Sequence, residues 1–406
     1  MNETPGVAAR EKPGSRDSGS RVMWALAPLA LTALLVAIFL AVGPLGIFHG
    51  EIPPVEVLAV ERIRLLPDEF VLDVVNDGPD PVTVAQVLVN DAYWQFQMSP
   101  GKTIPRLGSA RVRIRYPWEP GSTQFVTLLS STGVTFPFEI PVATVTPRPT
   151  PRFLSMFAML GVYVGVIPVF LGILWLPFLK RLKTGGYQFF LALTVGLLVF
   201  LGLDAFVESL ETVKKAPEIY RGMGVAAIGL LGTILILSAI SHRTRAAAAL
   251  HGGENMRNLM LAYSIAFGIG VHNLGEGLAI GGAYAAGEMT LGALLVLGFM
   301  IHNVTEGVAI VAPVARGDVQ IRHLVILGLL AGVPTILGTW TGAFSFSAIW
   351  SVLFLAVGAG AVLQVVFEIT RSMARSTATP LLAPGNVSGF LCGLGVMYVT
   401  GFFAAT

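Results

Sequence analysis

Two copies of one polar motif stand inside a strongly apolar part of this 406-residue chain. The first copy reads HNLGEGLAI from His272, and the second reads HNVTEGVAI from His302. Each copy places a histidine, an asparagine and a glutamate in a run that otherwise has the composition of a membrane helix. Ionisable groups in hydrocarbon are costly unless they are paired, hydrated or bound to a cation. Because the chain carries this costly pattern twice, chance is a poor explanation for it.

The composition of the chain indicates a membrane protein. Hydrophobic residues make up 54% of the sequence and charged residues 12%, which is typical of polytopic membrane proteins rather than soluble ones. The single cysteine excludes an intrachain disulfide and a cysteine-based zinc cluster. The sequence also lacks the Gly-x-x-x-x-Gly-Lys-Ser/Thr loop that binds nucleotide phosphates, which argues against direct coupling to ATP.

Changes in composition divide the chain into five segments. Residues 1–21 are polar, and we predict a disordered cytoplasmic tail there. Residues 22–48 are apolar and long enough to cross a bilayer, so we predict a membrane anchor helix, with a cleaved signal peptide as the alternative. Residues 51–145 are predicted to form a β-sandwich outside the cytoplasm, and residues 146–152 a proline-rich linker. Residues 153–406 then form the main transmembrane domain.

The predicted β-sandwich contains six short runs in which apolar and polar residues alternate. Turn-forming residues separate several of these runs, at positions 76–79, 99–101 and 119–121. Short strands at this spacing are typical of an antiparallel sandwich of immunoglobulin-like type. Because no combination of residues in this segment indicates catalysis, we predict a structural or interaction module. The sequence does not identify the partner of this module.

Eight apolar segments follow the linker, and we predict that each is a transmembrane helix. They cover residues 153–178, 185–210, 219–241, 256–286, 289–314, 321–344, 347–371 and 386–404. Most basic residues between them fall in loops on the side of the N-terminal tail. The positive-inside rule therefore places the N-terminus in the cytoplasm, and the β-sandwich and the C-terminus outside it. We predict a multi-pass protein of the cell membrane, surrounded by the lipid bilayer.

The spacing within the two motifs indicates a metal site. His272 and Glu276 are four residues apart and share one helix face, as do His302 and Glu306. Consecutive spans with a short connector run antiparallel, so the two faces meet at one depth. Two nitrogen and two or more oxygen donors suit zinc and related first-row divalent ions, whereas all-oxygen sets suit magnesium or calcium. A hydrogen-bonded network that only holds the helices together is the alternative. Two asparagines are predicted to help a second cation or to orient the ligands: Asn273 and Asn303.

Four further polar residues are candidates for an ion pathway. Asp204 and Glu208 share a face near the outer end of the second predicted span, where they could attract cations. Ordinary interfacial charge at a helix end explains them equally well. Gln364 and Glu368 share a face of the seventh span, toward its inner end. Glu368 either helps to release the metal or pairs with Arg371 near the membrane surface.

The sequence pair HNLGEG and HNVTEG resembles the fourth and fifth helices of the ZIP family of divalent metal transporters. The pattern is most similar to the GufA-like bacterial branch, in which each motif runs His-Asn-x-Pro-Glu-Gly. The resemblance covers about residues 153–406 and implies a bundle of eight helices with outward termini. It also implies a first metal site, made of the two histidines and two glutamates, and a neighbouring site that uses Asn273, Asn303 and the shared Glu306. Transport would proceed toward the cytoplasm by alternating access of one helix group against another.

Three positions depart from the family pattern. Gly275 and Thr305 stand where the family has proline, a residue that kinks a helix and frees a carbonyl group. Val333 precedes Pro334, where many members have a Glu-Pro pair. Valine cannot bind a metal, so the neighbouring site lacks one expected carboxylate. We therefore predict a single-metal site rather than a two-metal centre.

Together these observations predict that the protein transports divalent transition metal ions, most of all zinc, toward the cytoplasm. They predict a transporter rather than an enzyme. The ligand set does not separate Zn²⁺ from Fe²⁺, Mn²⁺, Co²⁺ or Cd²⁺. One alternative is a membrane-embedded zinc-dependent hydrolase, although the sequence contains no His-Glu-x-x-His motif and no separate catalytic group. Another is a non-transporting metal sensor that signals through the β-sandwich. Nothing predicts a nucleic-acid partner, and a homodimer is left open.

Overall fold

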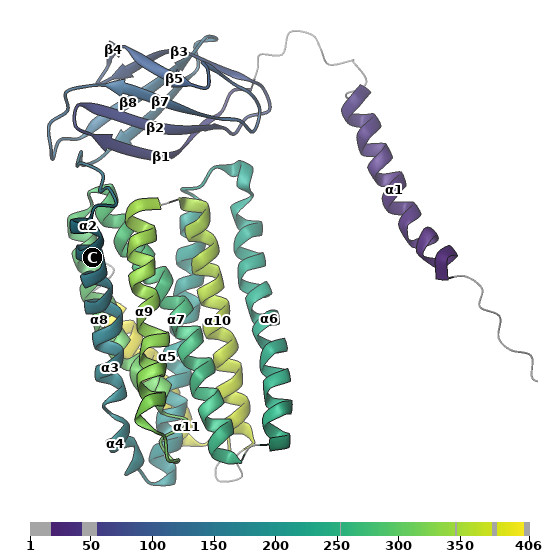
Figure 1. Cartoon of the computed structure of the whole chain (residues 1–406), viewed down its shortest axis with the longest axis vertical. Coiled ribbons are helices and arrows are strands. Elements are labelled where there is room, and N and C mark those ends of the chain that lie inside the picture. The colour runs from purple at the N-terminus through teal and green to yellow at the C-terminus, as the bar shows by residue number, and fades with distance from the viewer. Residues whose placement is uncertain (1–17, 43–54, 252, 346, 376–379, 402–406) are drawn as a thin grey trace, which may run out of the picture. The chain divides into compact units, whose positions relative to one another are not determined.

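The computed structural model describes residues 18–42, 55–251, 253–345, 347–375 and 380–401. The chain divides into two compact units, Met1–Val55 and Glu56–Thr406, and each is described by itself. The described part of the first unit contains one long helix, α1 (Ser18–Val42), which overlaps the predicted anchor (Figure 1). The remainder of the predicted tail and anchor lies outside the described residues.

The second unit begins with a sandwich of two antiparallel sheets. Its strands are β1 (Leu58–Leu66), β2 (Glu69–Asn76), β3 (Val82–Val89), β4 (Ala92–Trp94), β5 (Phe96–Ser99), β6 (Thr103–Ile104), β7 (Ser109–Arg115), β8 (Gln124–Ser130) and β9 (Thr135–Ile140). One sheet has the order β1-β2-β7-β5, and the other has the order β4-β3-β8-β9 with β6 paired to β3. With β4 as an additional edge strand, this is the strand order of an immunoglobulin constant domain. The predicted β-sandwich is confirmed.

The interior of the β-sandwich explains why its long strands could be predicted from the alternation of apolar and polar residues. Along β7 the apolar residues Val112 and Ile114 are fully buried, whereas the arginines that alternate with them are exposed. They meet Val87 and Leu128 of the opposite sheet in one hydrophobic core. Strands β4, β5 and β6 are two to four residues long, which is too short for alternation to show in a sequence.

The rest of the second unit is helical. The α-helices are α2 (Pro151–Gly161), α3 (Ile167–Ile173), α4 (Leu176–Lys180), α5 (Thr184–Val213), α6 (Gly222–His251), α7 (Glu254–Ala286), α8 (Met289–Val311), α9 (Ile321–Ser345), α10 (Ala348–Ala374) and α11 (Pro384–Gly401). A π-helical turn, η1 (Val162–Val166), joins α2 to α3, and a 3₁₀ turn, η2 (Glu218–Tyr220), precedes α6. Helix α2 begins inside the predicted linker, because proline suits the first helical turn and the Thr150 hydroxyl accepts a hydrogen bond from Phe153 N–H (3.4 Å).

Six helical segments among the described residues are long and apolar enough to cross a membrane. They are Pro151–Lys180, Thr184–Val213, Glu218–Arg243, Met289–Val311, Ile321–Ser345 and Ala348–Ala374. The chain therefore has the helices of a multi-pass membrane protein. Helices α7 and α11 match the two remaining predicted spans, which stay predictions. Helix α7 is less apolar because it carries one polar motif and many glycines.

The helices pack in two groups, which we call the site group and the outer group. In the site group, α7 packs most extensively on α9, while α3 with its π-helical turn packs on α8 and α2 packs on α9. In the outer group, α5 packs on α10 and α11, and α6 packs on α10. The contact of α10 with α7 is the main connection between the groups.

Glycines bring α7 and α9 into unusually close contact. Gly277 and Gly281 on α7 are four residues apart, as are Gly338 and Gly342 on α9. A Cβ atom added to Gly277 would lie 2.2 Å from the carbonyl oxygen of Thr335, and one added to Gly338 would lie 2.2 Å from that of Leu274. Small residues at this spacing allow helix backbones to touch in a membrane. They hold the first polar motif in a fixed position beside α9.

Candidate metal centre

A tight connection between α7 and α8 sets the two motifs at one depth. Gly287 ends α7 in the left-handed conformation (φ 83°), which is favourable for glycine, and α8 starts at Met289. His272 lies 15 residues before Gly287, and His302 lies 15 residues after it. At the helical rise of about 1.5 Å per residue, both histidines are about 22 Å from the connection.

The four predicted ligands form one buried cluster. His272, Glu276, His302 and Glu306 each offer a ligand atom, and these atoms all lie within 4.8 Å of one another. None of the four residues is more than 7% exposed. Two imidazole nitrogens and two carboxylate oxygens within such a space match the donor set of a first-row divalent cation. The structure therefore brings together all four residues that the motif spacing selected.

Glu276 is the centre of the hydrogen bonds in this cluster. Its Oε1 atom lies 3.2 Å from His272 Nε2 and also contacts His302 Nε2. Its Oε2 atom accepts a hydrogen bond from Asn303 Nδ2 (3.0 Å). The first motif is thus joined to the second through one carboxylate. Both Nε2 atoms face this carboxylate, so they point toward the same place within the cluster.

Several acceptor atoms beside Glu276 are buried without a partner. Both carboxylate oxygens of Glu306 and the Oδ1 atoms of Asn273 and Asn303 have no hydrogen-bond partner among the described residues. An unsatisfied buried polar group costs roughly 1–3 kcal/mol, and a charged group costs more. Native proteins pair such groups or bind an ion or water to them. The cluster therefore has an excess of oxygen acceptors, which a cation would satisfy.

Backbone carbonyls orient the two asparagine side chains. Asn273 Nδ2 donates to the Ala331 carbonyl of α9 (3.2 Å), and Asn303 Nδ2 donates to the Val164 carbonyl of η1 (3.0 Å). The donor side of each amide is thereby used, and its oxygen is left as an acceptor. Val164 is a site contact that sequence reasoning missed. The available signal was Pro168, which has no N–H to bond the carbonyl four residues earlier.

Each position that departs from the ZIP pattern has a defined place in the structure. Thr305 Oγ1 donates to the His302 carbonyl of its own helix (2.6 Å). Gly275 lies in the wall of a cavity that approaches the cluster, one residue before Glu276. Val333 has 36% of its surface exposed and lies outside the group of four ligands. The single-metal site stays a prediction.

The cavity that reaches Gly275 has a volume of about 720 Å³. It starts beneath the β-sandwich and is lined by Glu208 and by residues of α7 and α10, including Leu278, Ala279 and Leu355. Glu208 thus lines the same cavity as Gly275. Asp204, one helical turn away on α5, is exposed and is not among the lining residues.

Gln364 and Glu368 lie away from the four-residue cluster. Gln364 Nε2 donates to Glu368 Oε1 (3.1 Å) and to Ser241 Oγ of α6 (3.2 Å). These contacts are buried between α6 and α10, which both belong to the outer group. Neither of these two hydrogen bonds involves the histidines, and the role of Glu368 in metal release stays a prediction.

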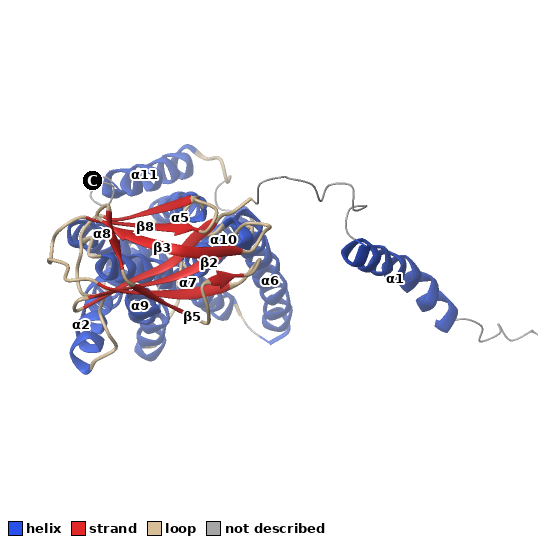
Figure 2. Cartoon of the chain, turned by 90° about the horizontal axis from the view of Figure 1, so that it is seen from above, coloured by secondary structure: helices blue, strands red, loops and turns tan. Residues whose placement is uncertain are grey.

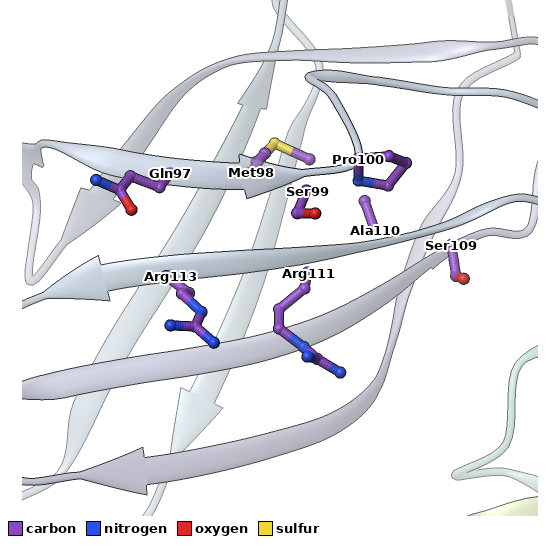
Figure 3. A pocket seen from close by; sticks show the side chains of 8 residues that line it. All are labelled: Gln97, Met98, Ser99, Pro100, Ser109, Ala110, Arg111 and Arg113. Carbon is purple, nitrogen blue, oxygen red and sulfur yellow. The ribbon is translucent and has the colours of Figure 1, made fainter.

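A second hollow lies on the β-sandwich, between β5 and β7 (Figure 3). It has a volume of about 490 Å³, and its lining includes Gln97, Ser99, Arg111 and Arg113. Arg111 Nε donates to Asp73 Oδ1 (2.7 Å), so this arginine already has an acidic partner. Among the described residues that line the hollow, no acid–base or nucleophilic pair is present. This hollow is therefore a weaker candidate for the functional site than the buried His/Glu cluster.

Comparison with known proteins identifies no family for this chain. No protein-family model matches it, and no curated protein matches it. The resemblance to ZIP transporters therefore rests on the two motifs. What the structure adds is that these motifs, from two antiparallel helices, form one buried His/Glu cluster.

Proposed function

We propose that this chain is a ZIP-like transporter of divalent transition metal ions, and that zinc uptake toward the cytoplasm is its main activity. One observation carries the proposal. Two histidines and two glutamates converge in a buried cluster between apolar helices, and both oxygens of Glu306 lack a partner there. A cation with two positive charges would offset the two carboxylates and satisfy these oxygens.

The ligand chemistry favours zinc and its neighbours. Each histidine supplies a neutral nitrogen and each glutamate an anionic oxygen, a mixed set that suits zinc, iron, manganese, cobalt or cadmium. An ion that reaches the cluster exchanges part of its water shell for Glu276, Glu306 and the two imidazoles. Asn273 and Asn303 then act as secondary contacts, since their free oxygens lie beside the ligands.

The arrangement of the helices supports alternating access. All four ligands, together with the carbonyls that orient the two asparagines, belong to the site group. The outer group contributes Glu208 and Leu355 to the wall of the approach cavity. A movement of the site group relative to α5 and α10 would therefore carry the ion together with all four of its ligands. In this proposal α7 and α11 complete an eight-helix bundle with both termini of residues 153–406 outside.

Metal uptake by cells that express the full chain tests this proposal. His272→Ala, Glu276→Ala and Glu306→Ala should each abolish uptake above background at an unchanged protein level. Thr305→Ala is the matched control, because the Thr305 hydroxyl, as far as the described residues show, bonds only the backbone of its own helix. Normal uptake in all three ligand variants would contradict the proposal. Metal binding without flux would instead favour a sensor.

A further inference from the structure

The β-sandwich is attached to the site group by its chain connection and by two sets of contacts. Residues 141–150 lead from β9 directly into α2. Arg62 Nη2 donates to the Phe344 carbonyl near the end of α9 (2.6 Å). Thr144 lies against the α7–α8 connection, where a Cβ added to Gly287 would be 2.5 Å from its Oγ1 atom. Arg62 is partly buried, and this burial, with a smaller effect from Arg64, lowers the pKa of its guanidinium.

The β-sandwich contacts the outer group through one turn. The carboxylate of Asp77 accepts hydrogen bonds from Glu218 N–H (2.7 Å) and from Ile219 N–H, both in the α5–α6 connection. Tyr220 in the same turn donates to Glu61 (3.3 Å). Hydrogen bonds to an ionised acceptor are stronger than neutral ones, so Asp77 makes the principal polar contact on this side.

The turn that carries Asp77 is held in place by its neighbour Asn76. The Asn76 side chain is fully buried and donates to the carbonyls of Asp80 (2.7 Å) and Ile104 (3.0 Å). Its oxygen accepts from Gly78 N–H (2.9 Å). Asp77 is thus presented at a defined position rather than on a freely moving loop.

The approach cavity lies beneath the β-sandwich. Its lining includes Arg62 and Ile63 of β1 and Pro141 after β9, together with Glu208 and Gly275 of the helices. Viewed from above, the strands cover the ends of the helices (Figure 2). An ion that reaches the cluster through this cavity must therefore pass under the edge of the sandwich.

We propose that the β-sandwich is a lid over this cavity, and that the contact of Asp77 with the α5–α6 turn is its latch. The lid stays with the site group through α2, Arg62 and Thr144, whereas the latch connects it with the outer group. Any movement between the two groups must break or shift the latch. The role of the lid in metal entry rests on the proposed transport function, but its position over the cavity does not.

A labelling experiment tests the lid without relying on transport. In a full-length Cys392→Ser chain, Ala279→Cys introduces a single thiol on the cavity wall. Its reaction rate with a bulky, membrane-impermeant maleimide is measured on intact cells. Asp77→Ala should raise this rate severalfold, because the lid is then held on one side only. Asp91→Asn is the control, since it removes a carboxylate from another turn of the sandwich. Equal rates with and without Asp77 would overturn the proposal.

A covalent link between residues 77 and 218 should hold the lid in place, which is the opposite of the Asp77→Ala change. Asp77→Cys and Glu218→Cys, in the same background, are joined as a disulfide with a mild oxidant, which takes the two thiol hydrogens and leaves the distant, unpaired thiol of Ala279→Cys free, and the joined peptides are quantified by mass spectrometry. We expect slower labelling at Ala279→Cys and loss of zinc uptake, both restored by a reducing agent that is washed out before the assay. Unchanged labelling in the joined protein would overturn the lid. If labelling slows but the unjoined parent shows no zinc uptake, the lid stands and the transport proposal fails.

Discussion

Asn303 Nδ2 donates a 3.0 Å hydrogen bond to Glu276 Oε2 and so joins the second polar motif to the first. The same Nδ2 atom also donates to the Val164 carbonyl, which fixes the amide between α7 and η1. Asn303 therefore positions the central carboxylate of the cluster from two sides. Partners of this kind, next to the ligands, strongly influence metal affinity.

Replacing Asn303 should weaken zinc binding without abolishing it. In Asn303→Ala, Glu276 loses one hydrogen bond and the Val164 carbonyl loses its donor, so we expect about a 10- to 100-fold loss in affinity. Equilibrium binding of zinc to purified protein measures this loss. Thr305→Ala, two residues away, should bind zinc as tightly as the wild type. Equal affinities for both variants would show that Asn303 does not position Glu276.

Removing the charge of Glu306 should stabilise the metal-free protein and abolish its stabilisation by zinc. Both oxygens of this carboxylate are buried without a hydrogen-bond partner, so Glu306→Gln removes a buried charge and keeps the shape of the side chain. We expect a gain of about 1–3 kcal/mol in unfolding free energy, seen as a higher melting temperature without metal. Glu368→Gln is the control, because that carboxylate accepts a hydrogen bond from Gln364. A Glu306→Gln protein that zinc still stabilises fully would contradict the assigned ligand role.

Zinc affinity should fall as the pH falls from 7 to 5. Metal binding needs neutral imidazoles and ionised carboxylates, so protons compete with the metal for all four ligands. Titrations of zinc binding to the purified protein between pH 5 and pH 7 measure this loss of affinity. An affinity that does not change with pH would exclude histidine and glutamate as the ligands.

Close packing of α7 on α9 should make Gly281 sensitive to the smallest side chain. A Cβ at this position would lie 2.3 Å from the Thr339 carbonyl oxygen, so Gly281→Ala forces the two helices apart. We expect a loss of roughly 1–3 kcal/mol in stability and a lower melting temperature. Gly232→Ala is a matched control on α6, where an added Cβ meets nothing within 4 Å. A similar change in both variants would argue against the tight contact.

Local patterns predicted much of this structure. Alternation of apolar and polar residues predicted β3, in which Val82, Val84, Val87 and Val89 are buried, whereas the apolar residues of β2 are buried on both faces of the strand and alternate less strictly. The four-residue spacing and the short connector predicted the cluster, because α7 and α8 are regular helices that turn sharply at Gly287.

Other features depend on contacts between distant parts of the chain. The Val164 carbonyl meets Asn303 across 139 residues, and Asp77 meets Glu218 across 141. No local periodicity encodes such a pair, since it depends on how complete helices and the sandwich pack. The predicted role of Glu368 rested on helix position alone, and that position could not show its buried contact with Gln364.

Uptake of labelled zinc by proteoliposomes that contain only the purified full-length chain tests the central claim most directly. The account predicts that zinc accumulates in the wild-type vesicles, and that unlabelled divalent transition ions compete while magnesium and calcium do not. It also predicts that Glu276→Gln, which removes the charge shared by both motifs, reduces uptake to the level of empty vesicles. Zinc uptake by Glu276→Gln at the wild-type rate, or no uptake by the wild type, would contradict it.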